Sequence, residues 1–248
     1  MNNLLQYTLR IADSSLILGQ RMSEWCSKGP TLEEDIAMSN IGLDLFGQAN
    51  GLYDYASQLD QSRSSDQLAF TRNEREFFNH QLTEQENGNF GTTTVRNFLH
   101  DAFNFLFYTE LSNSKDETLA AIAAKSLKEV KYHLRHSKNW LIRLGDGTKE
   151  SNLKVQEALD YLWQYTGELF EMDEIDNEML KLGIGVDNTS LKSKWDKIID
   201  DTLEKAKLNR PKDGYMATGS KKGIHTEHLG FLLAEMQFLP RAYPNAKW

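Results

Sequence analysis

The stretch Asp116–Leu144, DETLAAIAAKSLKEVKYHLRHSKNWLIRL, indicates the fold class of this chain. Apolar residues recur in it every three or four positions, which places them along one face of an α-helix. The stretch lies within residues 31–210, which contain no proline and repeat this kind of pattern many times. The four prolines of the chain are Pro30, Pro211, Pro240 and Pro244. Because residues 31–210 also lack a good hairpin dipeptide between alternating stretches, the sequence predicts an all-α protein.

Composition and charge exclude several classes of protein. The 248 residues are 40% hydrophobic and 26% charged, and no apolar run approaches the roughly 18 residues that a membrane span needs. The 28 basic and 36 acidic residues give a net charge of −8, which disfavours binding to a phosphate backbone. The single cysteine, Cys26, excludes an internal disulfide, and we expect it to be a small buried helix residue. Residues 1–6 lack the pattern of a signal peptide, so we expect a cytoplasmic protein.

Capping residues mark where helices begin. Three stretches, Thr31–Glu34, Thr71–Glu74 and Ser114–Glu117, place a hydroxyl three residues before a glutamate, which is the capping-box spacing. Thr226 is expected to cap the last helix. The predicted helices cover approximately residues 4–26, 32–59, 73–86, 94–111, 116–144, 153–170, 191–207 and 226–239.

The lengths of these helices predict an up-down bundle of four long helices with additional C-terminal helices. The loops between the long helices are short, so consecutive helices are expected to pack as antiparallel neighbours. We predict a single domain over residues 1–248, with a core bundle at about 4–170 and a helical extension at about 171–248.

Histidine spacing argues against a di-iron centre of the usual kind. Such a site in a four-helix bundle needs Glu-x-x-His on two helices, because that spacing puts both ligands on one helix face. None of the six histidines has an acidic residue three positions before it. Two His-x-x-His pairs remain, His133 with His136 and His225 with His228, and either could hold zinc with a carboxylate from elsewhere. Paired histidines on polar helices are more often surface or hydrogen-bonded residues.

Several segments resemble the C subunits of ring-1,2-phenylacetyl-CoA epoxidase, which belong to the PaaA/PaaC family. The matching segments, spread from end to end of the chain, are Ile11–Asp13, Leu18–Cys26, Asn40–Ala49, Ala69–Arg72, Glu84–Phe90, Lys128–Ser137 and Thr218–Gly230. The resemblance implies a ferritin-like helical bundle and a place in a multicomponent monooxygenase of aerobic phenylacetate catabolism. It also implies that a related A subunit holds the two irons that insert oxygen into the aromatic ring of phenylacetyl-CoA.

The resemblance further implies what has become of the iron ligands in this chain. The ligand positions of the A subunit fall at or near Leu16, at Gly47, Asn50, Asp101 and Val130, and at His133. Only Asp101 and His133 could bind a metal, and two ligands of six cannot balance the charge of two irons. We therefore expect no catalytic residue and no bound cofactor in this chain. Asp101 and His133 are expected to be the remnant of the metal site, as a buried pair joined by a hydrogen bond or as an ion pair.

A basic loop near the C-terminus is the candidate binding site. Lys221 and Lys222 lie between glycines, directly before the last predicted helix of an otherwise acidic chain. Coenzyme A carries phosphates, and lysines together with the free N–H groups of a helix start attract such anions. We expect a flexible loop in which Lys221 and Lys222, with His225 and His228, contact coenzyme A or the partner at the border with the catalytic subunit.

The resemblance implies a supporting, non-catalytic subunit with several partners. These are the catalytic A subunit and the other epoxidase subunits, including the reductase, with phenylacetyl-CoA at the subunit border; we also consider a homodimer. The alternative is an independent ferritin-like metalloenzyme that uses an unconventional ligand set around Asp101, His133 and His136. Iron content of the purified chain separates the two hypotheses.

Overall fold

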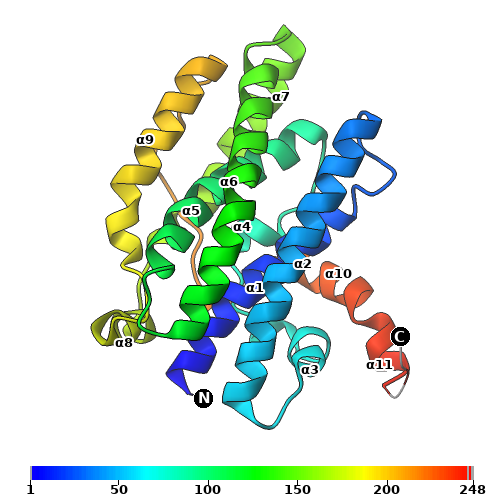
Figure 1. Ribbon diagram of the computed structural model, residues 1–248. Coiled ribbons are helices and arrows are strands. Elements are labelled where there is room, and N and C mark those ends of the chain that lie inside the picture. Colours follow the sequence, from blue (N-terminus) through cyan, green and yellow to red (C-terminus); the bar gives the residue numbers. More distant parts are fainter. Residues whose placement is uncertain (1, 245, 247–248) are drawn as a thin grey trace. The chain divides into compact units, whose positions relative to one another are not determined.

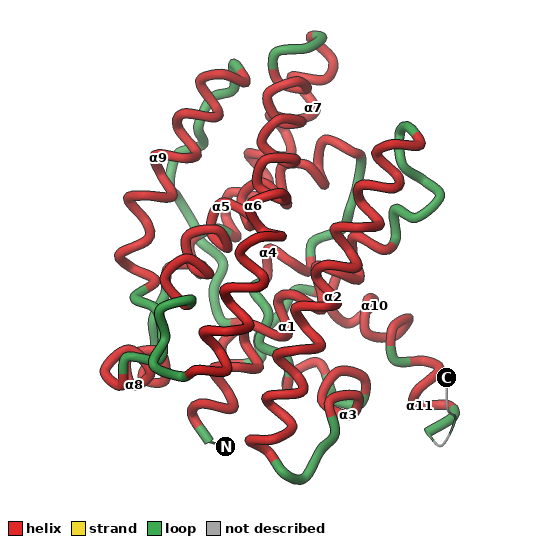
Figure 2. The backbone as a smooth tube through the Cα atoms, in the orientation of Figure 1, coloured by secondary structure: helices red, strands yellow, loops and turns green. Residues whose placement is uncertain are grey.

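Helices make up all the regular structure in the described part of the chain. The computed structural model describes residues 2–244 and 246, and these contain α-helices and short 3-10 turns but no strand (Figures 1 and 2). The prediction of an all-α fold is confirmed. Within the same residues no helix combines the length and the apolar character needed to cross a bilayer.

The chain divides into two compact units. Unit 1 consists of residues 1–85 and 219–248, and unit 2 of residues 86–218. The predicted single domain, with its core at 4–170 and its extension at 171–248, stays a prediction.

Unit 1 is built on a helical hairpin of α1 (Asn3–Ser23) and α2 (Leu32–Asp60). The two helices run antiparallel, since Gly42 of α2 lies beside Met22 whereas Tyr53, further along α2, bonds to Asp13. The remaining elements of unit 1 are α3 (Ser65–Phe70), η1 (Glu74–Glu76), α4 (Gln81–Glu84), η4 (Ser220–Lys222), α10 (Glu227–Met236) and α11 (Phe238–Ala242). Segments from both ends of the chain therefore complete this unit.

Unit 2 packs its helices around an aromatic core. Its elements are α5 (Phe90–Leu111), α6 (Glu117–Gly145), α7 (Lys149–Leu162), η2 (Trp163–Tyr165), η3 (Gly167–Phe170), α8 (Glu174–Leu182) and α9 (Asn188–Ala206). Trp195 of α9 is fully buried, packs against the rings of Trp163 and Phe170, and donates from its indole nitrogen to the Leu99 carbonyl at 3.1 Å. The helix α5 is buried along most of its length, as its apolar sequence predicts.

Several predicted boundaries are wrong. The stretch from residue 73 to 86 forms the 3-10 turn η1 and the four-residue α4 instead of one helix. At α6 the side chain that caps the helix is Asp116, since Ser114 donates its hydroxyl to the Ile184 carbonyl. Cys26 is exposed, because α1 ends at Ser23 before reaching it. The spacing of residues along the chain does not predict these helix ends correctly, because tertiary hydrogen bonds compete for the same hydroxyls and backbone groups.

Candidate functional site

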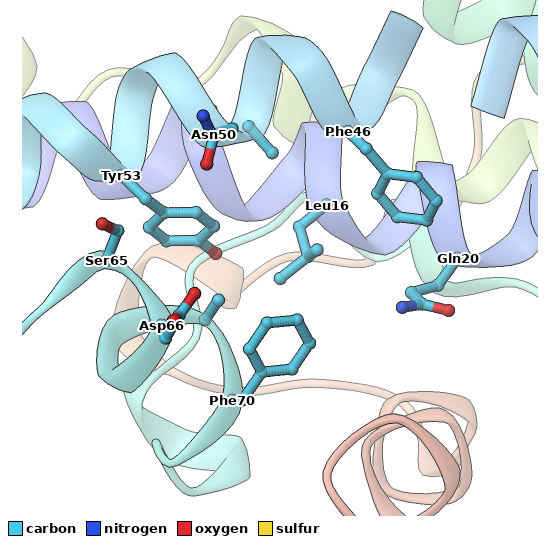
Figure 3. Close-up of a pocket in the computed structure, with 10 residues that line it drawn as sticks. Leu16, Gln20, Phe46, Asn50, Tyr53, Ser65, Asp66 and Phe70 are labelled. Carbon is cyan, nitrogen blue, oxygen red and sulfur yellow. The ribbon is translucent and has the colours of Figure 1, made fainter. Parts of the chain in front are cut away.

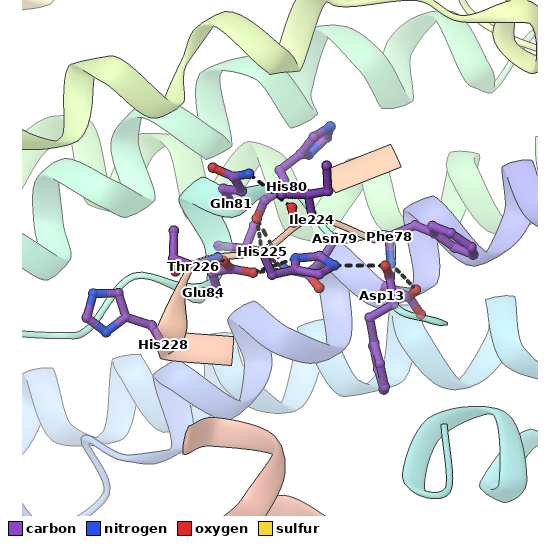
Figure 4. Close-up of polar contacts among 12 residues, drawn as sticks. Asp13, Phe78, Asn79, His80, Gln81, Glu84, Ile224, His225, Thr226 and His228 are labelled. Carbon is purple, nitrogen blue, oxygen red and sulfur yellow. Dashed lines mark hydrogen bonds and ion pairs between the residues drawn. The ribbon is translucent and has the colours of Figure 1, made fainter. Parts of the chain in front are cut away.

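The loop before α10 carries the four residues that the sequence predicts to contact coenzyme A or a partner. Lys222 is exposed, and Lys221 and His228 are partly exposed. The side chain of His225, in contrast, is completely buried and faces the interior of unit 1 (Figure 4). The loop therefore has an outer part, which carries the lysines, and an inner part built on His225.

The loop that carries the lysines is a closed turn, not the flexible segment predicted. The backbone N–H of Ile224 donates to the Gly219 carbonyl at 3.1 Å, and Gln81 of α4 donates to the Ile224 carbonyl at 3.0 Å. Gly223 has φ of +69°, and a Cβ there would lie 2.2 Å from the carbonyl oxygen of Arg75. Only glycine meets both requirements, so this position fixes the path of the loop.

Glu84, at the end of α4, is the centre of the buried part. Its Oε1 accepts from the backbone N–H of Thr226 at 2.6 Å and from the Thr226 hydroxyl at 2.7 Å. Its Oε2 lies 2.9 Å from the Asn79 side-chain amide and 2.9 Å from Nδ1 of His225. Four hydrogen-bonding groups thus converge on one carboxylate whose side chain is fully buried.

The hydrogen bonds of His225 define how many protons this cluster holds. Nε2 lies 2.8 Å from the Phe77 carbonyl oxygen, which can only accept, so Nε2 carries a proton. Nδ1 faces Oε2 of Glu84, and a bond between these two atoms requires a second proton. The His225–Glu84 pair therefore holds one proton between Nδ1 and Oε2 in addition to the proton on Nε2.

The Glu84 carboxylate lies at the start of α10, where the sequence predicts that a phosphate binds. Glu84 Oε1 accepts from the N–H of Thr226, the residue that precedes α10. An anion at this place is favoured by the free N–H groups and the dipole of the helix. Thr226 was expected to cap α10, but its side chain does not, because its hydroxyl donates to Glu84.

Arg21 of α1 ties the ends of this cluster together. Its Nε and Nη2 donate to the Glu84 carbonyl oxygen at 3.0 and 2.8 Å, and Nη2 also reaches the His228 carbonyl oxygen at 3.3 Å. A third nitrogen, Nη1, pairs with Glu24 at 2.8 Å. One guanidinium therefore connects α1, the end of α4 and the first turn of α10.

A second buried carboxylate, Asp13 of α1, is satisfied in the same way. It accepts from the Tyr53 hydroxyl at 2.6 Å, from the backbone N–H of Phe78 at 2.8 Å, and from both terminal nitrogens of Arg72. The Arg72 guanidinium also lies 4.1 Å from the centroid of the Phe77 ring. Burial opposes the charge of Arg72, but Asp13 and Tyr53 outweigh it and raise its pKa above the ordinary value. Burial and the Asp13 charge raise the pKa of Tyr53 as well, so its hydroxyl remains a donor.

In unit 2 the remnant positions Asp101 and His133 are both buried. Asp101 accepts a hydrogen bond of 2.7 Å from Ser137, one turn after His133, and this bond joins α5 to α6. Burial raises the pKa of Asp101 to about 6, although His133 and the Ser137 hydroxyl act in the opposite direction. The expected tie between the two helices exists, but Ser137 makes the hydrogen bond.

The residues at the ligand positions do not fit two irons. In unit 1, the side chains of Leu16 and Gly47 have no atom that could bind a metal, and Asn50 has only a neutral amide. In unit 2, Val130 has no such atom either, which leaves Asp101 and His133. Iron centres of this class are held by several carboxylates and imidazoles, which supply the negative charge that the cations need. Across residues 2–244 and 246, no group of three His, Cys, Asp or Glu side chains could hold a metal ion, so Asp101, His133 and His136 form no such set.

A pocket of about 350 Å³ opens in unit 1 between α1, α2 and α3. Figure 3 shows Leu16, Phe46 and Phe70 converging on it from these three helices. Its polar residues include Asp66 and Ser65, and the Ser65 hydroxyl already donates to Asp54 at 2.7 Å. With apolar walls and an acidic residue, the pocket is unsuited to a phosphate.

The residues predicted from the sequence do not include Asp13, Arg72 and Glu84, the centres of unit 1. All three lie in segments that carry the family resemblance, but no spacing rule joins residues so far apart in the chain. Asp13 did carry a signal, since it stands with Leu9 and Leu16 on the apolar face of α1, where a lone carboxylate needs partners. For Glu84 we find no comparable signal.

Comparisons with known proteins agree over the full length of the chain. The PaaA_PaaC family model, described as "Phenylacetic acid catabolic protein", matches residues 1–248. The chain is also 49% identical, over 248 residues that make up 100% of both sequences, to a protein of Escherichia coli (strain K12) that is named as the C subunit of 1,2-phenylacetyl-CoA epoxidase.

Replacing Glu84 tests the buried cluster. In Glu84→Gln the amide presents its own N–H groups to some of the four converging groups and no longer offers Nδ1 of His225 a carboxylate. We expect the free energy of unfolding to fall by about 3–5 kcal/mol. Urea unfolding measures it, and the exposed Glu227→Gln, at the start of α10, is the matched control with an expected loss below about 1 kcal/mol. Equal losses in both variants would contradict this account of the cluster.

The raised pKa of Asp101 predicts a specific dependence of stability on pH. In the folded state the Asp101 carboxyl keeps its proton up to about pH 6, whereas in the unfolded chain it releases the proton near pH 4. The free energy of unfolding of the wild type therefore falls as the pH rises from about 4 to about 6. Asp101→Asn removes this penalty, so its free energy of unfolding relative to the wild type should rise by about 3 kcal/mol between about pH 4 and pH 7. Chemical unfolding at a series of pH values measures the difference, with the exposed Asp201→Asn as the control for net charge. A difference that does not change with pH would refute the prediction.

Proposed function

Because the chain belongs to the PaaA/PaaC family of phenylacetic acid catabolic proteins over its whole length, we propose that it serves as the C subunit of a 1,2-phenylacetyl-CoA epoxidase. The observation that carries the proposal is the 49% identity to a protein of that name, which covers 100% of both chains. Such coverage leaves no large segment of the relative without a counterpart here.

In this proposal the chain supports catalysis without performing it. The iron that activates dioxygen belongs to the A subunit, and Leu16, Gly47 and Val130 replace donors at the positions where this chain would need them. Its contribution is to bind the A subunit and the other subunits, including the reductase. The side chains of Asp13 and Glu84, which could otherwise act as acids or bases, are each occupied by four donors inside unit 1.

Lys221 and Lys222 are proposed to bind the phosphates of the coenzyme A group at the border with the catalytic subunit. They lie on η4, a basic turn of a chain with net charge −8, and Gly223 and Gln81 fix the path of that turn. A preorganised pair of cations loses less freedom on binding an anion than a flexible one. His225 and His228 position the turn without contacting the phosphates themselves. His225 does so through its bond to Glu84, and His228 through the hydrogen bond that its carbonyl oxygen accepts from Arg21. A direct contact of His225 with coenzyme A would require breaking both of its ring hydrogen bonds.

Co-expression with the A subunit tests the supporting role. We expect the two chains to co-purify, the A subunit to carry the iron, and this chain alone to contain no stoichiometric iron or zinc and to consume no oxygen. Metal analysis and oxygen uptake of the separated chains and of the complex measure this. Two irons bound to this chain by itself would instead support the independent metalloenzyme.

Charge reversal at the turn tests the coenzyme A contact. In the double variant Lys221→Glu with Lys222→Glu, repulsion of the phosphates should raise the KM of the reconstituted complex for phenylacetyl-CoA roughly tenfold or more. The KM for phenylacetyl-pantetheine, which lacks the 3′-phosphate and the pyrophosphate, should stay unchanged.

The control for this test is the double variant Lys28→Glu with Lys149→Glu, which reverses the same number of exposed charges elsewhere. An unchanged KM for phenylacetyl-CoA in the Lys221 and Lys222 variant would refute the contact. An equal rise for both thioesters would show a structural effect instead.

A further inference from the structure

The exposed face of α6 carries a concentration of positive charge that the fold does not use. Between Glu117 and Gly145 six Lys or Arg residues stand against two Glu, whereas the rest of unit 2 has 12 basic and 20 acidic residues. The six cations are Lys125, Lys128, Lys131, Arg135, Lys138 and Arg143, and we call them the α6 basic face. Lys138 is half-buried and the other five are exposed.

Helix geometry places these six residues side by side. At 3.6 residues per turn they fall within an arc of about 140°, and from Lys125 to Arg143 they extend over about 27 Å. The buried residues of α6, among them Leu119, Val130 and Leu141, occupy the opposite side of the helix. The face is therefore a continuous stripe along α6, the long green helix of Figure 1.

The α6 basic face differs from the charged faces of the neighbouring helices. On α7, Lys154 pairs with Glu150 at 2.6 Å, and on α9, Lys192 pairs with Asp196 at 2.6 Å, in each case one turn apart. Within residues 2–244 and 246, none of the six α6 cations forms an ion pair. Instead the first five, from Lys125 to Lys138, follow one another at spacings of three or four positions, where like charges repel and weaken a helix.

Aromatic rings order part of this stripe. The guanidinium of Arg135 lies 5.5 Å from the ring centroid of Tyr132, which is itself exposed, and that of Arg143 lies 5.4 Å from the ring centroid of Trp140. Arginine and tyrosine are among the residues that most often dominate the binding energy at protein interfaces. Because rings hold these guanidinium groups in place, less freedom is lost when an acidic group binds them.

We propose that the α6 basic face is a docking surface for an acidic protein surface on another subunit of the same complex. This inference rests on the proposed function, which supplies the complex. A protein partner fits better than a nucleic acid or a membrane, because the acidic remainder of unit 2 repels an extended polyanion on either side of a single basic helix. A second copy of this chain fits less well, since two identical basic stripes repel each other when the same faces of two copies meet.

Charge reversal on the stripe tests the proposal in the assembled system. The variant Lys128→Glu, Lys131→Glu, Arg135→Glu and the wild type are each titrated with the separately purified remaining epoxidase subunits at low and moderate salt. We expect the Kd of the variant to rise roughly tenfold or more at low salt, and its dependence on salt to weaken, because the removed attraction is screened by ions. The neutral variant Lys128→Gln, Lys131→Gln, Arg135→Gln should lie between the two.

The matched control reverses three exposed lysines on α7 and α9, in Lys149→Glu, Lys197→Glu, Lys205→Glu, and should bind like the wild type. Circular dichroism and thermal unfolding establish that each variant folds. If the wild type assembles and both α6 variants bind as tightly as it does, the docking surface is refuted while the proposed function stands. If the wild type itself fails to assemble, both are refuted. Tighter binding of the wild type to duplex DNA or to phosphatidylserine vesicles than to the subunits would also overturn the proposal.

Discussion

Burial of two carboxylates is the constraint on which unit 1 depends. A carboxylate removed from water is costly unless donors reach both of its oxygens, and Asp13 and Glu84 each accept from four. These donors come from α2 and from the residues around η1, α4 and α10. Residues 71–85 form only short helices, so the bonds to these two side chains help to position them, together with the burial of Phe77 and Leu82.

The Glu84 cluster also bears on the proposed role of the C-terminal loop. A helix start preceded by lysines is an attractive place for a phosphate, but in α10 the Glu84 carboxylate already accepts from the N–H group of Thr226. The internal carboxylate fixes the turn, and this leaves the lysine side chains as the groups proposed to meet an external anion. Binding by such a turn relies on charge and preorganisation more than on the helix dipole.

Unit 2 is held together differently. Its core is aromatic and aliphatic, with Trp195 at the centre, and its buried carboxylate Asp101 has a raised pKa and a hydrogen bond from Ser137. Unit 2 therefore contains a buried acid whose desolvation is only partly offset by its neighbours. The exposed side of α6 carries cations that form no ion pair with other described residues. Acidic groups of another protein could therefore pair with these cations without disturbing the core of unit 2.

The sequence alone determined the all-α class, the long helices and which residues stand at the expected ligand positions, because helical periodicity and residue identity are local properties that one stretch of chain displays. The helix pattern in Asp116–Leu144 and the identities of Leu16, Gly47 and Val130 needed no coordinates. Only the tertiary structure decided that Glu84 meets His225 and Thr226, that Asp13 meets Arg72 and Tyr53, and that Ser137 bonds to Asp101. These partners lie between 36 and 142 residues apart, and the choice among the many donors that could satisfy a buried carboxylate is made by packing, which spacing along the chain does not encode.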